Sequence, residues 1–269
     1  MYNKTHSSRA KELELEKVVV NCFLKHNGNY GRPRIKAALE KEAINISEGK
    51  IARIMKKHGL VAKAGRRRKR NRPKKTEEQY IRENLLLGKD LKSLKRNEVW
   101  STDITEMNIK GSRIYMAGII DVASKRLVGY HIDTNMRQEL VHQAIKMATC
   151  KVDNTVGIIF HSDRGSQYTS RKTQEIVKGH NMIQSMSRPS KPNDNQAIES
   201  LWNSLKTELD TLSTLSRKEA IAKIFDYVGN YYNEERIHSS IGYNTPDQAY
   251  AEMEEHKNIT PLPEEYMET

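Results

Sequence analysis

The spacing of apolar residues changes partway along the chain, and its first section predicts helices. Before residue 60, apolar positions recur every three or four residues in three short stretches. The three stretches are residues 9–25, NYGRPRIKAALEKE and ISEGKIARIMKKHGL. In the third, Ser47 stands where a helix N-cap is expected and Gly59 where a helix C-terminus is expected. Short helices with a basic outer face are typical of a helix-turn-helix, although many small helical bundles share this pattern.

From residue 97 the apolar pattern is that of strands. EVWSTDITEMNI alternates, and it is followed by the apolar runs RIYMAGIIDVAS and RLVGYHI, which together predict an antiparallel meander. A helix in RQELVHQAIKMATC, a short strand in TVGIIFHSD, a helix over 170–180 and a strand in MIQSMS come next. This order predicts an α/β layer architecture with a mixed sheet.

A further helix is predicted over NDNQAIESLWNSLKTE, and its two sides differ in chemistry. Its buried stripe consists of Ile198, Leu201, Trp202, Leu205 and Leu209. Glu199, Asn203 and Lys206 share one polar flank beside that stripe. A solvated helix edge would have the same pattern, so the flank alone does not indicate a function.

The positive charge of the chain is concentrated near its N-terminus. Residues 1–75 hold 22 Lys/Arg and 6 Asp/Glu, a net charge of +16. Because the whole chain has 46 Lys/Arg and 34 Asp/Glu, the remaining residues hold 24 and 28, a net charge of −4. The densest basic run, GRRRKRNRPKK at 65–75, indicates a polyanionic partner such as nucleic acid. A disordered solubilising arm is the alternative.

Composition excludes several other classes of protein. The N-terminal residues lack the apolar middle of a signal peptide, and no run is long and apolar enough to span a bilayer. Cys22 and Cys150 are the two cysteines, without a C-x-x-C pair, so neither a disulfide framework nor a cysteine zinc site is expected. We therefore expect a soluble protein of the cytoplasm with no membrane partner.

Three carboxylates are candidates for a metal site. Asp103 lies in the first predicted strand and Asp163 at the end of the fourth, so the two meet if these strands are parallel neighbours. Glu199 could then reach the same place from its helix. Oxygen ligands of this kind suit Mg²⁺ or Mn²⁺, and two such ions can activate an attacking hydroxyl at phosphorus. The rival carboxylates that remain open are Asp121, Asp133, Asp194 and Glu208.

Several motifs in register resemble the catalytic core of the DDE transposases of bacterial insertion sequences. The motifs are WSTDIT, IIDVASKRLVGYHI, FHSDRGSQYTS, SMSRPSKPNDNQAIESLWNSLKTE and YYNEERIHSSIGYNTPDQAY. They are most similar to OrfB of the two-frame OrfA/OrfB type, relatives of retroviral integrases. Thirty-five residues separate Asp163 from Glu199, and Lys206 follows seven positions after Glu199, which matches that family. The segment before the core resembles the family's helix-turn-helix-like region.

The resemblance implies a fold and a division of the chain. The fold would be an α/β, ribonuclease H-like mixed five-stranded sheet flanked by helices, preceded by a small all-α helix-turn-helix-like domain. The expected parts are a DNA-binding region (1–64), a basic linker (65–96), an integrase catalytic core (97–250) and a C-terminal tail (251–269).

The resemblance also implies a metal-dependent polynucleotidyl transferase that cuts and joins DNA at the ends of an insertion sequence. Asp103, Asp163 and Glu199 would bind two Mg²⁺ or Mn²⁺ ions. The expected partners are double-stranded DNA, as terminal inverted repeats and as target, and further copies of the chain in at least a dimer. An OrfA protein or a frameshifted OrfA–OrfB fusion is a further expected partner, because Met1 opens an OrfB-like chain. The zinc-binding module of retroviral integrases is not found here, so zinc is not expected.

Nine residues are candidates for contact with DNA. They are Lys50 and Arg53 on the recognition-type helix, Arg66, Arg67, Arg68, Lys69 and Arg70 in the basic run, and Asn203 and Lys206 beside Glu199. Two other functions stay open: a DNA-binding regulator of the element that uses the core as scaffold, and a nuclease that cuts without joining.

Overall fold

The computed structural model describes residues 3–63, 81–189 and 191–254. The chain divides into two compact units, Met1–Arg66 and Arg67–Thr269, and each is described here on its own. Across the described residues, no helix combines the length and apolar character needed to cross a membrane.

The first unit consists of helices, as the sequence predicts. They are α1 (Asn3–Lys25), α2 (Arg32–Lys41) and α3 (Glu48–Lys57). Ser47 caps α3, since its side chain accepts a hydrogen bond from the Lys50 N–H at 3.3 Å. After the last turn, Gly59 has a φ of +62°, the left-handed conformation that ends many helices. The buried residues between the three helices include Val19, Phe23, Ile35, Leu39, Ile51 and Ile54.

The second unit is built on a mixed sheet, which confirms the predicted fold class. The strands are β1 (Val99–Ile109), β2 (Ser112–Asp121), β3 (Leu127–Asp133), β4 (Ile159–Ser162) and β5 (Ile183–Met186). The described residues place them in the order β3-β2-β1-β4-β5. β1, β2 and β3 form the antiparallel meander, whereas β4 and β5 run parallel to β1.

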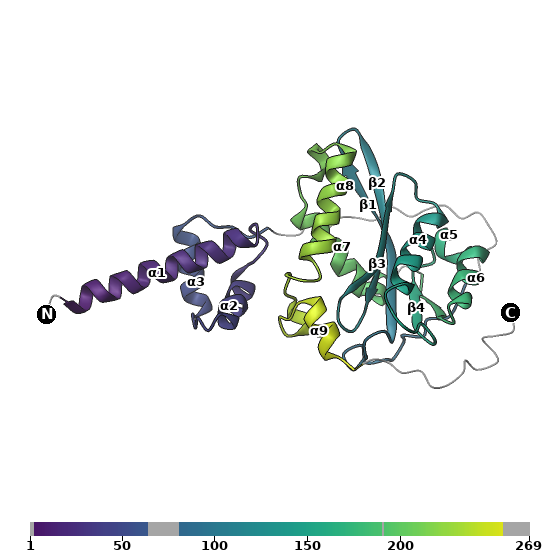
Figure 1. Cartoon of the computed structure of the whole chain (residues 1–269), viewed down its shortest axis with the longest axis horizontal. Helices are drawn as coiled ribbons and strands as arrows, with labels where there is room; N and C mark the ends of the chain where they lie inside the picture. The colour runs from purple at the N-terminus through teal and green to yellow at the C-terminus, as the bar shows by residue number, and fades with distance from the viewer. Residues whose placement is uncertain (1–2, 64–80, 190, 255–269) are drawn as a thin grey trace. The chain divides into compact units, whose positions relative to one another are not determined.

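Helices cover both faces of this sheet (Figure 1). One face carries α4 (Gln138–Thr149), α5 (Ser166–Thr169) and α6 (Arg171–Gly179). The other carries α7 (Gln196–Glu208) and α8 (Arg217–Asp226), and α9 (Pro246–Glu252) follows near the end of the described chain. Short 3₁₀ turns lie at Pro192–Asn195, Leu212–Thr214 and Ser239–Ile241, and a π-helical turn at Tyr227–Tyr231 follows α8.

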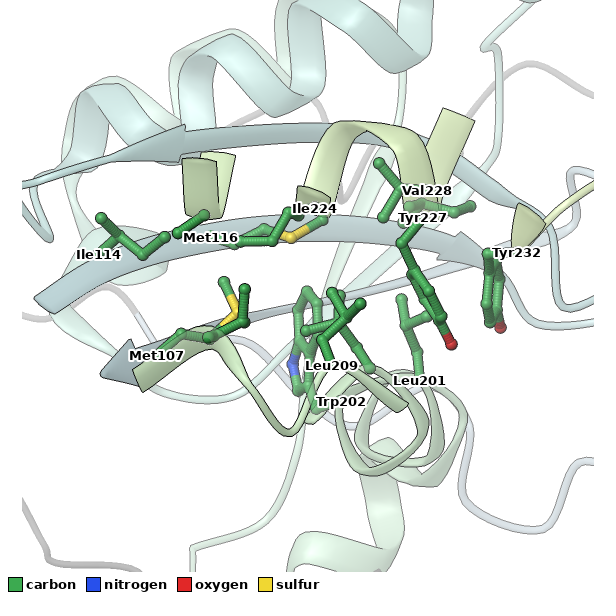
Figure 2. Packing of buried hydrophobic residues seen from close by; sticks show 14 of the residues in the cluster. Met107, Ile114, Met116, Leu201, Trp202, Leu209, Ile224, Tyr227, Val228 and Tyr232 are labelled. Atoms are coloured by element: carbon green, nitrogen blue, oxygen red, sulfur yellow. The ribbon is translucent and has the colours of Figure 1, made fainter. Parts of the chain in front are cut away.

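The two faces have separate apolar cores because side chains alternate along each strand. On β2, Ile114 and Met116 pack toward α7 and α8, whereas Ala117 and Ile119 pack toward α4. Figure 2 shows the first of these cores, with the indole of Trp202 directed from α7 toward the strands.

The segment before β1 and helix α9 contact other parts of the second unit. In residues 81–96, assigned to the linker from the sequence, Arg82, Glu83 and Leu85 bond to β5, and the Met186 N–H donates to the Glu83 carbonyl at 3.1 Å. At the other end, the Asn97 amide donates to the Tyr250 hydroxyl at 2.7 Å. The described chain therefore returns to the start of β1 before it ends.

Candidate active site

Asp103 on β1 and Asp163 directly after β4 come at the same level of two neighbouring parallel strands. The β1–β4 register pairs Ser101 with His161, and each aspartate follows two residues later. Both side chains therefore belong to the edge that the carboxyl end of β4 forms with β1, which is where ligands of open α/β sheets bind. The interpretation of these two residues required β1 and β4 to be parallel neighbours, and they are.

Asp103 is held by the indole of Trp202. The carboxylate is 3 % exposed, and its Oδ2 accepts a hydrogen bond from Trp202 Nε1 at 3.1 Å. Gly118 pairs with Asp103 across β1 and β2. A Cβ at Gly118 would lie 2.6 Å from the Trp202 ring, so only glycine lets the indole lie against the strand at this point. The close packing of α7 on the sheet therefore delivers a hydrogen-bond donor to the buried carboxylate.

The first turn of α7 is tied to β1 at a second point. Asn195, which immediately precedes α7, is buried, and its side-chain amide donates to the Thr102 carbonyl at 2.9 Å. The Ser101 hydroxyl also donates to the Asn195 side-chain oxygen. Glu199 lies between this anchor and Trp202 along the helix, and Trp202 is three residues later on a neighbouring face. The two anchors place the turn that bears Glu199 beside the strand that bears Asp103.

Asp163 follows β4 at the start of a turn. Its Oδ1 accepts the Gly165 N–H at 2.9 Å, so this side chain also stabilises the turn. The carboxylate is partly exposed, which leaves room for a second role.

Tyr168 lies close to both aspartates, and nothing in the sequence singled it out. Its hydroxyl is within 3.1 Å of the Thr102 hydroxyl, and its ring is buried. Burial raises the pKa of Tyr168 well above its usual value, and the negative charges of Asp103 and Asp163 raise it further. The phenol therefore stays neutral and is influenced by both carboxylates. In the sequence, its position five residues after Asp163 is the feature that could have identified it.

The donor set suits an oxygen-ligated divalent cation, but the structure does not gather all three carboxylates around one point. Within residues 3–63, 81–189 and 191–254, no group of three His, Cys, Asp or Glu side chains is close enough to hold a metal ion. Asp103 and Asp163 come at one level of the sheet, whereas Glu199 belongs to α7, which packs on β1 and β2. Carboxylates without His or Cys are the ligands that Mg²⁺ and Mn²⁺ prefer.

The rival carboxylates have structural partners of their own. Asp121 is fully buried and accepts the Asn97 and Ser124 N–H groups at 2.9 Å, and burial raises its pKa. Asp133 accepts N–H groups of the residues that follow β3. The other two are ion-paired, Asp194 with Arg188 and Glu208 with Arg236.

The candidate DNA-binding residues fall into three groups. Asn203 is exposed and Lys206 partly exposed, on the Glu199 flank of α7. Lys50 is partly exposed and Arg53 exposed on α3. The basic run of Arg66, Arg67, Arg68, Lys69 and Arg70 lies outside the described residues.

A cavity of about 790 Å³ lies on another side of α7 and is distinct from the carboxylates. Its lining includes Ser101, Asn195, Ser200 and His238, but not Asp103, Asp163 or Glu199. This cavity is therefore not where the candidate chemistry lies.

Known protein families match both units. An HTH-like domain matches residues 10–70, and an integrase core domain matches residues 93–192, with a second integrase core model over residues 180–246. The transposase for insertion sequence element IS904 of Lactococcus lactis is 32 % identical over 247 residues, which covers 91 % of this chain and 97 % of that protein. The chain belongs to the insertion-sequence transposases that carry an integrase core. The resemblance stated from the sequence motifs is therefore confirmed.

Other relatives agree with this assignment. The transposase is 30 % identical to the putative transposase InsK for insertion sequence element IS150 of Escherichia coli, over 90 % of this chain and 85 % of that protein. Among solved structures, an intasome of simian T-cell lymphotropic virus matches 85 % of this chain and 76 % of its own, with a TM-score of 0.50 and 16 % identity. That likeness shows the shared ribonuclease H-like fold. The chain is thus a polynucleotidyl transferase of the integrase-core type that serves transposition.

Proposed function

We propose that this transposase is of the DDE type, with Asp103, Asp163 and Glu199 as its catalytic, metal-binding residues. The observation that carries the proposal is the common level of Asp103 and Asp163 on neighbouring parallel strands, with α7 anchored beside them through Trp202. The bound ions would be two Mg²⁺ or Mn²⁺, which lower the pKa of an attacking hydroxyl and neutralise charge at phosphorus.

The reaction consists of two displacements at phosphorus. In the first, a water oxygen attacks a phosphodiester at the element's end, and the bond to the 3′-oxygen breaks to leave a free 3′-hydroxyl. In the second, that hydroxyl attacks a target phosphodiester, forms a new ester bond and releases a target 3′-hydroxyl. Trp202 keeps Asp103 oriented through its hydrogen bond, and Lys206 faces the DNA phosphates as a point charge without binding metal.

The proposed substrate is double-stranded DNA, first as the element's terminal inverted repeats and then as target. Lys50 and Arg53 of α3 and the basic run of residues 66–70 would neutralise phosphates, and Asn203 would contact DNA beside Lys206. Because two element ends are processed together, the active assembly holds at least two copies of the chain. An OrfA protein, or an OrfA–OrfB fusion, is the proposed additional partner.

The test removes one charge at a time and keeps the shape of each side chain. Asp103→Asn, Asp163→Asn and Glu199→Gln should each reduce strand transfer by about a thousandfold or more, and combining them should add little. Thermal melting and duplex binding should stay near wild type. Strand transfer is measured on a labelled, pre-cut oligonucleotide carrying the element's end, and Mn²⁺ binding by calorimetry.

The matched control is Asp133→Asn. Asp133 ends β3, at the level of Tyr115 and two strands away from β1, so its loss should leave most activity intact. An active Glu199→Gln protein would refute the assignment of the third ligand. Retained duplex binding with no strand transfer in the wild type would instead favour a regulator of the element.

A further inference from the structure

The segment that follows α8 contains a motif, YYNEERIHSSIGYNTPDQAY, for which the proposed chemistry has no use. In the structure it carries Arg236, whose guanidinium enters a buried ion pair with Glu208 of α7. The two side chains are 3 % and 4 % exposed. Arg236 Nε lies 2.9 Å and Nη2 2.8 Å from Glu208 Oε1, so one oxygen receives two donors.

Further contacts complete the coordination of this pair. Arg236 Nη2 also donates to the Ser204 hydroxyl at 2.9 Å, and Arg236 Nη1 lies 3.0 Å from His238 Nε2. The Tyr227 hydroxyl donates to the second oxygen of Glu208 at 2.9 Å. Burial alone would lower the pKa of Arg236, but the adjacent Glu208 charge outweighs it and the pKa is raised. Arg236 therefore keeps its positive charge in this buried position.

The residues that Arg236 contacts lie on the flank of α7 opposite the candidate chemistry. Ser204 and Glu208 come five and nine residues after Glu199, which at roughly 100° per residue turns them away from it. Lys206, seven residues after Glu199, returns to the Glu199 flank. Trp202 holds α7 to Asp103 on the sheet side.

Apolar contacts alone do not fix how far a helix is rotated or shifted along its axis. A buried ion pair adds little net stability over apolar residues of similar size, and its better-attested role is to specify one arrangement. Arg236 contacts two residues one turn apart on α7, so it opposes both rotation and sliding of that helix. Its planar guanidinium suits this task, because the donors are fixed in one geometry.

We infer that Arg236, paired with Glu208, is a positioning residue that sets the rotation and axial register of α7 and thereby the place of Glu199 and Lys206. This inference rests on the proposed role of Glu199. Because the pair is enclosed on the far flank of α7, it touches neither metal nor DNA. Its effect on catalysis passes through the helix.

The test replaces the pair with apolar residues of similar size, Arg236→Met together with Glu208→Leu, so that no unpaired charge stays buried. The double variant should melt near the wild-type temperature and bind duplex DNA. Strand transfer should fall by about tenfold to a hundredfold, as expected for a small displacement of a catalytic group. The Mn²⁺ concentration for half-maximal activity should rise.

A second readout does not depend on activity. The chain has two tryptophans, whose indole N–H groups give separate signals in a ¹⁵N–¹H correlation spectrum. The Trp202 signal reports its bond to Asp103, and the Trp100 signal reports a bond to Asn97 at 3.1 Å, away from α7. In the double variant the Trp202 signal should shift and the Trp100 signal should stay.

The matched control is a pair that joins the same C-terminal segment to another element. Arg126 Nε and Asp247 Oδ1 are 2.5 Å apart, and these partly exposed side chains join the β2–β3 turn to α9. Arg126→Met with Asp247→Leu should leave the Trp202 signal and the metal requirement unchanged.

Two outcomes would overturn the inference. One is a folded Arg236→Met/Glu208→Leu protein with an unmoved Trp202 signal and wild-type metal requirement. Should that variant fail to fold, Arg236→Lys is tested instead, because lysine keeps the positive charge but lacks the planar set of donors. An unmoved Trp202 signal in Arg236→Lys is the second outcome that would overturn the inference. A wild-type protein without strand transfer would count against the proposed function, whereas the indole shift would still test the role of Arg236.

Discussion

Near the candidate site, a single buried histidine couples protonation to folding. His161 lies on β4, two residues before Asp163, and its ring nitrogens are 2.9 Å and 3.0 Å from the hydroxyls of Ser185 and Ser187. The ring is fully buried, and burial lowers the pKa of His161 from 6.5 to about 4. The imidazole therefore stays neutral and serves to join β4 to the strand and loop beside it.

This shift predicts a loss of stability in mild acid. The unfolded chain binds a proton at His161 near pH 6.5, whereas the folded chain binds it near pH 4. The neutral His161 thus contributes on the order of 3 kcal/mol to the free energy of unfolding above pH 6.5. This contribution is lost as the pH falls toward 4. Urea unfolding between about pH 7 and about pH 4.5 should show a steeper decline for wild type than for His161→Asn. Parallel declines would contradict the assignment.

For single residues, the sequence indicated which carboxylates to consider for the site, but not which side chains contact them. The strands that lead to Asp103 and Asp163 are parallel neighbours, as the interpretation from the sequence required. The donors that hold them could not be predicted. Trp202 was assigned only to a buried stripe, and its bond to Asp103 spans 99 positions of sequence. Glu208 was left as a rival ligand, and its enclosure by Arg236 could be known only from the folded chain.

Among the elements, α7 is the one whose exact placement matters most. It packs on β1 and β2, and its closest approach is the Trp202 ring over Gly118. A methyl group at Gly118 would lie 2.6 Å from one ring carbon and 3.1 Å from another, closer than carbon atoms normally approach. The ring cannot move without giving up its bond to Asp103.

We therefore expect Gly118→Ala to destabilise the protein and to impair catalysis together. Overpacking of this kind costs about 1–3 kcal/mol, and displacement of α7 would separate Glu199 from the aspartates. Thermal melting and strand transfer are the two measurements. The control is Gly179→Ala at the end of α6, where an added Cβ meets nothing within 4 Å. If Gly118→Ala melts and reacts like Gly179→Ala, the ring is not held as described.

For the whole molecule, the distribution of charge predicts how the transposase binds DNA. Residues 1–75 hold 22 Lys/Arg against 6 Asp/Glu, whereas the remaining residues are slightly acidic. Deleting residues 1–75 should remove most of the duplex affinity. The slope of log K against log salt should fall by about 0.9 for each DNA phosphate that the shortened protein no longer neutralises.

A full-length variant separates the basic run from the helices of the first unit. Replacing Arg66, Arg67, Arg68, Lys69 and Arg70 with glutamine should reduce the salt slope while α1, α2 and α3 are kept. Binding is measured by fluorescence anisotropy at several salt concentrations. If the protein that lacks residues 1–75 binds with unchanged affinity and salt slope, the charges of residues 1–75 do not contact DNA.

At the level of the whole chain, the sequence predicted a helical part followed by an α/β part, and the order of the main elements as far as α7; it did not predict α8 or α9. The change from helical to strand periodicity near residue 97 marks where the sheet begins, at Val99. The sequence could not predict which distant segments of the second unit contact each other, because single side chains make these contacts. Asn233 bonds both backbone groups of Leu127, and Asn97 bonds Tyr250, across more than a hundred positions.

The return of the chain to its own first strand sets the order in which the site is assembled during synthesis. Protein chains are made from the N-terminus, and a domain folds as a unit once its residues have emerged from the ribosome. All three candidate carboxylates have been made by residue 199, but Arg236 and Tyr250, which brace α7 and close the sheet, are made later. A nascent transposase thus carries its cutting residues before it can hold them in place. A chain released early, just after residue 208, would contain all three carboxylates, but the helix that bears Glu199 would lack the contacts of Arg236.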